Sequence, residues 1–174
     1  VYLISKANSF NGAQNFGSGM VTTNIGYLGF GLVTNTSDIT VSGTNSVAGT
    51  IDVYGAALTI SGAQTTTAGG DINLNGTGAV SISANQTSAD QVNVTGSNIA
   101  VSGSLSAAAT TGTGLLLKAT GDITTSGSRS FTTSGSNATF WSDSDANGSG
   151  RIGFDATNSI TTSGGRITIA GGAD

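Results

Sequence analysis

Apolar and polar residues alternate in short segments that recur along most of this chain, and the segments are separated by Gly, Ser and Asn. One pattern, which we call the ITVSG series, begins at Ile39, Leu58, Val80, Ile99, Ile123 and Ile160. A second pattern, the IDV series, lies at Ile51, Ile72, Val92, Leu115 and Thr139. Alternation at period two with turn residues at both ends predicts short β-strands that are buried on one face.

The two patterns recur in a fixed order at nearly fixed spacing, which favours a solenoid over a meander of hairpins. Successive starts of the ITVSG series are 19, 22, 19, 24 and 37 residues apart. We therefore expect an all-β fold, a parallel β-solenoid of about seven coils of roughly 20 residues. The start residues from Ile39 to Ile123 should stack as one interior column in a core of Ile, Val and Leu. Phe131, in the arc that closes a coil, indicates a third face.

The N-terminal part differs from the rest. Residues 1–37 do not join the repeat cleanly, and they hold five of the ten aromatic residues: Tyr2, Phe10, Phe16, Tyr27 and Phe30. We expect 1–37 to form variant coils or a partial cap, and 38–174 to form regular solenoid repeats in one continuous domain. The chain begins without an initiating Met or a cleavage site, and only four residues follow the strand-like segment 166–170. We expect an uncapped slice of a longer chain.

Charged residues are few, and this narrows the possible partners. The chain has five Lys and Arg and nine acidic residues, all Asp, so that 8% of it is charged. So few cations cannot form a basic patch, and no apolar run approaches the ~18 residues of a membrane span. We expect no nucleic-acid partner and no membrane insertion. The lack of Cys fits many compartments, but an outward-polar chain that is rich in Ser, Thr and Asn and free of Glu hints at an exported surface protein, so we expect an extracellular or cell-surface location.

Three segments carry a family resemblance. They are GDINLNGTGAVSISA at 70–84, VNVTGSNIAVSGSLSAAA at 92–109 and LLLKATGDITTSG at 115–127. They resemble the repeats of filamentous-haemagglutinin-like exoproteins, which are bacterial β-helix proteins of two-partner secretion or autotransporter systems. The likeness covers roughly residues 38–174. It implies a right-handed β-helix, surface display, structural length and adhesion. The N-terminal secretion domain of that family is not recognisable in this sequence.

Catalytic residues are scarce. The chain has no His and no Glu, so that a Ser–His triad and a pair of glutamates are both impossible. Some β-helices degrade polysaccharides with clustered Asp. Here Asp38 and Asp122 precede ITVSG segments whereas Asp71 precedes an IDV segment, so the stack should not bring them into one cluster. We expect a protein that is not an enzyme.

The densest polar segment is DSDANGS at 143–149. Asp143, Asp145 and Asn147 have the alternating spacing of oxygen ligands in a calcium loop, but the Glu of such a loop is missing and the twelfth position is Phe154. An exposed turn explains the same residues, because Asp, Asn, Gly and Ser are favoured in turns. Calcium is the only cofactor that the sequence suggests.

The outward positions of the ITVSG series predict a hydroxyl face. One row is Thr40, Thr59, Ser81, Ala100 and Thr124, and the row beside it is Ser42, Ser61, Ser83, Ser102 and Ser126. Such rows resemble the Thr-rich faces of ice-binding solenoids, although Ala100 interrupts the first row. A solvated strand face is the alternative. Phe140 and Trp141 are adjacent, so one ring should be exposed, and an exposed Trp is able to stack on a sugar.

The sequence thus predicts a structural and adhesive shaft module of an extracellular bacterial surface fibre or secreted adhesin. Its partners would be neighbouring coils of the same longer chain, further copies joined end to end, or a host surface or glycan. The alternative functions are an ice- or carbohydrate-binding solenoid that uses the hydroxyl face and, as a third, a polysaccharide-degrading enzyme.

Overall fold

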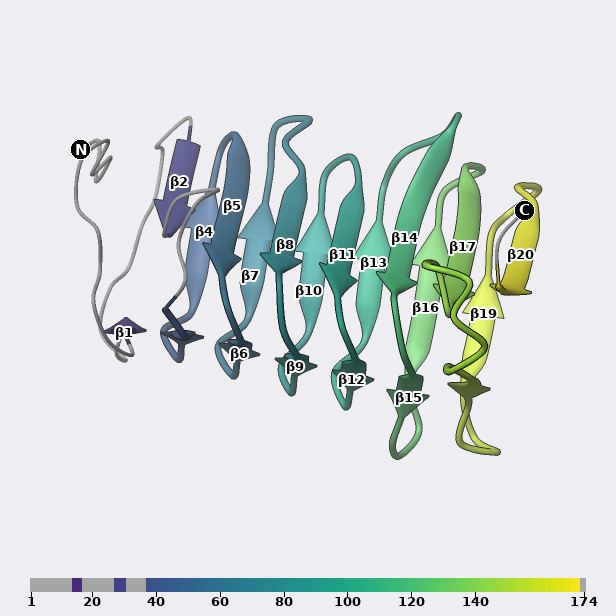
Figure 1. Cartoon of the computed structure of the whole chain (residues 1–174). Coiled ribbons are helices and arrows are strands. Elements are labelled where there is room, and N and C mark those ends of the chain that lie inside the picture. The colour runs from purple at the N-terminus through teal and green to yellow at the C-terminus, as the bar shows by residue number, and fades with distance from the viewer. Residues whose placement is uncertain (1–13, 17–26, 31–36, 173–174) are drawn as a thin grey trace.

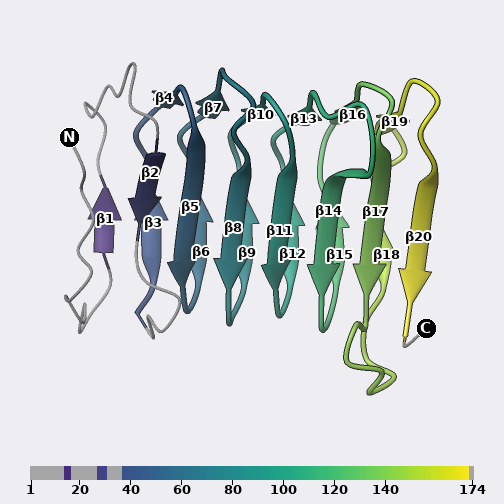
Figure 2. The ribbon, with the colours of Figure 1, turned by 90° about the horizontal axis from the view of Figure 1, so that it is seen from above.

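The computed structural model describes residues 14–16, 27–30 and 37–172, in which the regular elements are all β-strands. Three parallel sheets, here sheets A, B and C, run along one axis, and each turn of the chain visits them in the order B, A, C (Figures 1 and 2). The protein is an all-β parallel β-solenoid, which confirms the fold predicted from the repeat. The handedness implied by the family resemblance stays a prediction.

Each sheet takes one strand from each turn. Sheet A contains β1 (Gln14–Phe16), β3 (Ile39–Val41), β6 (Leu58–Ile60), β9 (Val80–Ile82), β12 (Ile99–Val101), β15 (Ile123–Thr125) and β18 (Ile152–Gly153). Sheet B contains β2 (Tyr27–Phe30), β5 (Thr50–Gly55), β8 (Ile72–Gly76), β11 (Val92–Gly96), β14 (Thr113–Ala119), β17 (Asn137–Ser142) and β20 (Ile167–Gly171). Sheet C contains β4 (Asn45–Val47), β7 (Gln64–Thr66), β10 (Gln86–Ser88), β13 (Leu105–Ala107), β16 (Ser130–Thr133) and β19 (Ser159–Thr161).

The N-terminal strands join the same sheets. β1 pairs with β3, and β2 pairs with β5, both in parallel. The remaining residues of the range 1–36 lie outside the described residues, and with them the aromatic residues Tyr2 and Phe10. Whether 1–37 forms variant coils or a partial cap therefore stays a prediction.

The turns vary in length, and this corrects one assignment. Five turns separate Ile39 from Ile152 on sheet A, with lengths of 19, 22, 19, 24 and 29 residues. These turns are slightly longer than the roughly 20 residues expected, and the structure describes slightly fewer of them than the expected seven. Ile160 was assigned to the same ITVSG series as Ile123, but Ile152 pairs with Ile123 on sheet A, and Ile160 pairs with Phe131 on sheet C. The segment ITTSG can form a strand on more than one face of the solenoid. Matching it to earlier segments therefore overlooked the strand β18, which contains Ile152.

A second correction concerns register. The IDV series placed Thr139 and Trp141 in equivalent positions to inward residues of the preceding turn. In the structure Ala138 and Phe140 pair with Leu115 and Leu117, and both are buried. Trp141 consequently points outward and is half-buried, in agreement with the expectation that one of the two adjacent rings is exposed.

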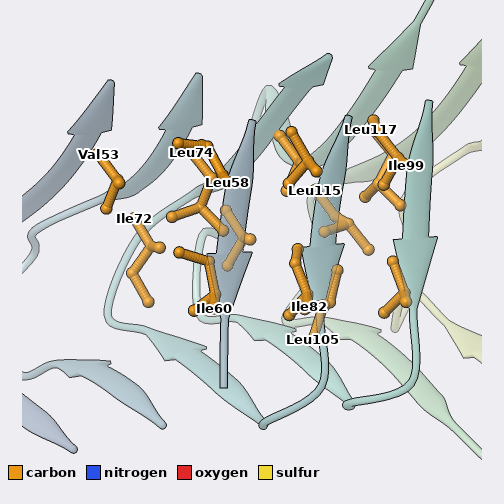
Figure 3. Close-up of a cluster of buried hydrophobic side chains, with 14 of the residues drawn as sticks. Val53, Leu58, Ile60, Ile72, Leu74, Ile82, Ile99, Leu105, Leu115 and Leu117 are labelled. Atoms are coloured by element: carbon orange, nitrogen blue, oxygen red, sulfur yellow. The ribbon is translucent and has the colours of Figure 1, made fainter. Parts of the chain in front are cut away.

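The interior of sheets A and B is aliphatic, as predicted. The side chains of Ile39, Leu58, Val80, Ile99 and Ile123 stack in one column, and each is at most 1% exposed. Figure 3 shows how side chains of sheet A, such as Ile60 and Ile82, and of sheet B, such as Leu74 and Leu117, fill the space between the sheets. Burying such side chains contributes about 1.5–3 kcal/mol each, which makes this ladder the main source of stability.

Sheet C departs from the expected ladder of Ile, Val and Leu. Its inward column begins with Asn45, Gln64 and Gln86, all of them buried, and continues with Leu105 and Phe131. The amide of Asn45 donates to Oε1 of Gln64 at 2.7 Å, and that of Gln64 donates to the carbonyls of Gly43 and Gly62. Hydrogen bonds of this kind are what makes the burial of an amide tolerable.

The coils approach each other closely at the corner between sheets A and C. A Cβ atom at Gly62 would lie 2.0 Å from the carbonyl oxygen of Gly43, and one at Gly103 would lie 2.1 Å from that of Ala84. No side chain fits at such distances. Glycine at these positions therefore allows the coils to stack at the spacing of hydrogen-bonded strands.

Candidate functional site

The hydroxyl row that the sequence predicted lies on sheet A. Thr40, Thr59, Ser81, Ala100 and Thr124 are in register, and all but the half-buried Thr40 are exposed. The second row, Ser42, Ser61, Ser83, Ser102 and Ser126, follows the strands by one residue and is exposed or half-buried. Ala100 interrupts the first row, and Gly153 follows Thr124. The predicted hydroxyl row is therefore present, but it is interrupted at Ala100 and ends at Gly153.

Sheet C carries a longer hydroxyl column, which sequence reasoning missed. Its outward positions are Ser46, Thr65, Thr87, Ser106, Thr132 and Thr161, in register and without interruption. The hydroxyl of Thr132 donates to that of Ser106 at 3.0 Å. The segments QTT at 64–66 and QTS at 86–88 were the available signal, but an inward Gln conceals the period-two pattern of apolar residues.

The predicted calcium residues lie in a protruding loop after β17, visible in Figure 2. Asp143 is 8% exposed, and its carboxylate accepts hydrogen bonds from the N–H groups of Gly148 and Ser149. The amide of Asn147 donates to Asp145 at 2.8 Å. Each of the three residues thus accepts a hydrogen bond from within the loop, on Asp143, on Oδ2 of Asp145 and on Oδ1 of Asn147. Within the described residues, no group of three or more His, Cys, Asp or Glu side chains lies close enough to hold a metal ion.

Carboxylates elsewhere join neighbouring coils. Asp38 accepts a hydrogen bond from the N–H of Ala57 at 3.0 Å. Asp122 accepts one from the N–H of Arg151 at 3.0 Å, and its other oxygen lies 3.7 Å from Nε of that residue in an exposed ion pair. These bonds satisfy backbone groups at the corners of the solenoid. Such a structural role accounts for both acids, while the expectation that the chain is not an enzyme stays a prediction.

Asp71 is the acid whose surroundings are least favourable for a charge. Burial raises the pKa of its carboxyl group above the ordinary value, and the charges of Asp90 and Asp52 raise it further. The N–H of Gln91, which donates to Asp71 at 3.1 Å, opposes this rise. Asp52 in turn accepts a hydrogen bond from the amide of Asn73 at 2.7 Å. This group lies on sheet B, away from both Asp38 and Asp122 in the fold.

Trp141, the residue that the sequence suggested for stacking on a sugar, makes two contacts within the fold. Its indole N–H donates to the carbonyl of Gly172 at 2.8 Å. The ammonium of Lys118, the residue in register with it on β14, lies 4.3 Å from the ring centroid. The ring therefore positions a cation, which is a contact that the sequence did not reveal, because the two residues are 23 positions apart.

Comparison with known proteins adds no family. No family model matches the chain, and neither a curated protein nor a solved structure matches it. In the described ranges, no helix is long and apolar enough to cross a membrane. The β-solenoid itself agrees with the resemblance to filamentous-haemagglutinin-like exoproteins, and membership of that group remains a hypothesis.

Proposed function

We propose that this chain is a structural and adhesive shaft module of an extracellular bacterial surface fibre or secreted adhesin. In this role it holds other parts of the fibre at a distance and carries no catalytic centre. Neighbouring coils of a longer chain, or further copies, extend it, and a host surface or glycan is the target of adhesion. The repeats that resemble filamentous-haemagglutinin-like proteins, at 70–127, support the same proposal.

The observation that carries the proposal is the continuity of the three sheets. From β3 to β17 each strand of sheets A and B pairs in parallel with the strand of the next turn, around a buried and mainly aliphatic interior. Hydrogen bonds run parallel to the axis, so a solenoid of this kind resists extension and bending. Length and stiffness are the properties that a shaft requires.

The strand β20 supports growth along the axis. Ile167 and Ile169 are in register with the buried Ala138 and Phe140, yet they are 45% and 57% exposed. Each therefore stands in an inward column that another turn would cover. Together with the unpaired N–H and C=O groups of an outermost strand, they form a surface on which further coils can stack.

Sedimentation velocity over a concentration series tests the proposal. We expect the 174-residue chain to form dimers and longer assemblies, because stacking covers Ile167 and Ile169. A variant with Thr168→Lys and Ile169→Lys should remain monomeric, since it places charges on both faces of β20. Lys at Thr124 and Ser126, on an outward face, is the matched control and should assemble as the unmodified chain does. A monomer at high micromolar concentration would contradict the proposal.

The unbroken column on sheet C favours a second candidate, a solenoid that binds ice or another ordered hydroxyl-rich surface. Strands about 4.8 Å apart repeat one hydroxyl group per turn there, which suits a periodic partner better than a flexible one. Thermal hysteresis tests this candidate. Thr87→Lys on sheet C should abolish the activity, whereas Thr59→Lys on sheet A should not. Absence of hysteresis in the unmodified protein would exclude binding to ice.

A further inference from the structure

A hollow of about 360 Å³ lies along the corner where sheet B turns into sheet A. Its polar lining comes from Thr77, Thr95, Ser97, Lys118, Thr120 and Ser144. Thr77, Ser97 and Thr120 directly follow β8, β11 and β14, and Ser144 lies in the loop after β17. The hollow therefore spans four successive turns, which at ~4.8 Å per turn is roughly 14 Å along the axis. Its volume is within the range of ligand sites in proteins.

The walls of this hollow are fixed by hydrogen bonds between turns. The N–H of Ser97 donates to Gly78 at 2.8 Å, and that of Thr120 donates to Gly96 at 3.1 Å. The N–H of Ser144 donates to Ala119 at 3.0 Å, so the first residues of the protruding loop are tied to the same corner. A site whose backbone is already ordered loses little conformational entropy when a ligand binds.

One cation is held at the hollow. The Trp141 ring stabilises the ammonium of Lys118 at 4.3 Å, and the indole N–H bond to Gly172 in turn fixes the ring. The described residues that line the hollow include hydroxyl groups and this ammonium but no carboxylate. Two acids, Asp143 and Asp145, flank Ser144 in the sequence. The carboxylate of Asp143 accepts hydrogen bonds from the N–H groups of Gly148 and Ser149, and that of Asp145 accepts one from the amide of Asn147. In a chain with a net charge of −4, the lining of this hollow thus offers an anion one cation and several hydroxyl groups.

We propose that the hollow binds an acidic saccharide chain. Lys118 pairs with its acid group, and the hydroxyls of Thr77, Ser97, Thr120 and Ser144 bond to the sugar hydroxyls along the axis. An extended chain fits the length of the hollow, and a single cation suits isolated acid groups better than the dense phosphates of a nucleic acid. This inference rests on the adhesive half of the proposed function, for which it names a ligand class. The structural half does not depend on it.

Isothermal titration of the 174-residue protein at low ionic strength tests this site. The probes are a galacturonic acid hexamer, a sulfated hexasaccharide and a neutral glucose hexamer. We expect at least one acidic chain to bind, and the neutral one to bind tenfold more weakly or not at all. The two acidic probes distinguish a carboxylate from a sulfate as the recognised group. Failure of both acidic chains to bind the folded protein would overturn the inference.

Two variants locate the binding. Lys118→Met keeps the length of the stem against Trp141 but removes the charge, and it should weaken binding at least tenfold. Arg166→Met removes the same charge from an exposed residue outside the hollow, and it should leave the affinity unchanged. Thr120→Glu adds a negative charge to the exposed rim, and it should abolish binding. Equal loss in the Lys118 and Arg166 variants would show that net charge alone is responsible.

The same variants separate this inference from the proposed shaft. Lys118→Met leaves β20 unaltered, so its sedimentation should match that of the unmodified chain. Loss of saccharide binding with normal assembly would support the site. Assembly without any saccharide binding would refute the site and leave the shaft proposal standing. A chain that binds saccharide but stays monomeric would refute the structural half of the proposed function and leave the site standing.

Discussion

The turns on the N-terminal and C-terminal sides of β13 both have aliphatic side chains on the inner face of sheet A, but the residues that point inward from sheet C differ. On the N-terminal side, Asn45, Gln64 and Gln86 point inward. On the C-terminal side Phe131 takes the same column, and its ring packs edge to face against Phe140 at 5.4 Å. Phe140 also contacts Phe154, at 5.1 Å between ring centroids. The same fold thus accommodates either amide side chains or aromatic rings in its interior.

The difference shows what each kind of filling requires. Inward amides are tolerated because the turn before or the corner beside them offers partners, as the carbonyls of Gly43 and Gly62 do for Gln64. Where no partner follows, the arrangement is incomplete: Oε1 of Gln86 is buried without a hydrogen bond, and Leu105 is next in its column. Aromatic rings need only volume and area. In the C-terminal turns, Phe131, Phe140 and Phe154 fill the interior in this way.

The largest effect is expected where the two regions are alike. Ile82→Asp should abolish cooperative folding, because it buries an unpaired charge in the aliphatic column of sheet A. Val94→Asp on sheet B should do the same. Ser81→Ala, on the outward face of the same strand as Ile82, is the control and should change little. Circular dichroism and thermal melting measure the effect. If all three variants melt alike, the inward and outward assignment is wrong.

In the aromatic region, Phe131→Ala should lower the free energy of unfolding by about 3–5 kcal/mol. The substitution leaves a cavity beside Phe140 and Phe154, whose edge-to-face contacts it also removes. Phe131→Leu keeps most of the volume and should cost less than half as much. Urea denaturation gives both values. A small effect of Phe131→Ala would mean that the neighbouring turns collapse into the space.

In the amide region, Gln64→Leu should destabilise by about 1–3 kcal/mol, because two carbonyls and the amide of Asn45 lose their partner. Gln86→Leu should cost less, since the Gln86 side chain makes only one hydrogen bond among the described residues, from Nε2 to the carbonyl of Ala84. A double-mutant cycle with Asn45→Leu should show favourable coupling between Asn45 and Gln64. Additive losses in that cycle would mean that the ladder is not a cooperative unit.

The protruding loop offers a smaller effect. Asp143→Ala should cost about 1 kcal/mol, because the N–H groups of Gly148 and Ser149 lose their acceptor. Asp145→Ala, on the exposed part of the loop, is the control and should be nearly neutral. Since the Asp143 oxygens are engaged, neither calcium nor a chelator should change the melting temperature. A rise with calcium that disappears in Asp143→Ala would instead establish the metal site.

The smallest effect concerns pH. Burial raises the folded-state pKa of Asp71, so the folded protein binds its proton more readily than the unfolded chain does. Stability should therefore fall as pH rises through the interval between the unfolded and the folded pKa. Asp71→Asn retains an oxygen for the N–H of Gln91, and it should slightly raise the melting temperature at pH 7 but not at a pH below the unfolded pKa. Melting curves at both pH values test this. A lower melting temperature at pH 7 would mean that the hydrogen bond from Gln91 outweighs the burial.

The sequence by itself determined the solenoid and the inward residues of sheets A and B. Aliphatic residues at period two have one stable position, inside, and their recurrence at nearly equal intervals permits stacking of like on like. Ile39 and Ile51 could be assigned to the core on this ground alone, and both are buried. The expectation of a hydroxyl row on sheet A followed from the same alternation.

Only the tertiary structure decided what depends on the register between turns. The inward Gln64, the placement of Ile160 on sheet C and the position of Lys118 over Trp141 all arise from which residues of different turns lie side by side. From sequence alone, a polar residue in a strand is assigned to the outer face unless a hydrogen-bond partner inside the fold is known. After the turn of 29 residues, the ITTSG segment at Ile160 lies on sheet C instead of sheet A. Burial of an apolar side chain is a property of the residue. Burial of an amide, or the fixed position of a cation, depends on the residues beside it, and the stacking of the turns determines which residues those are.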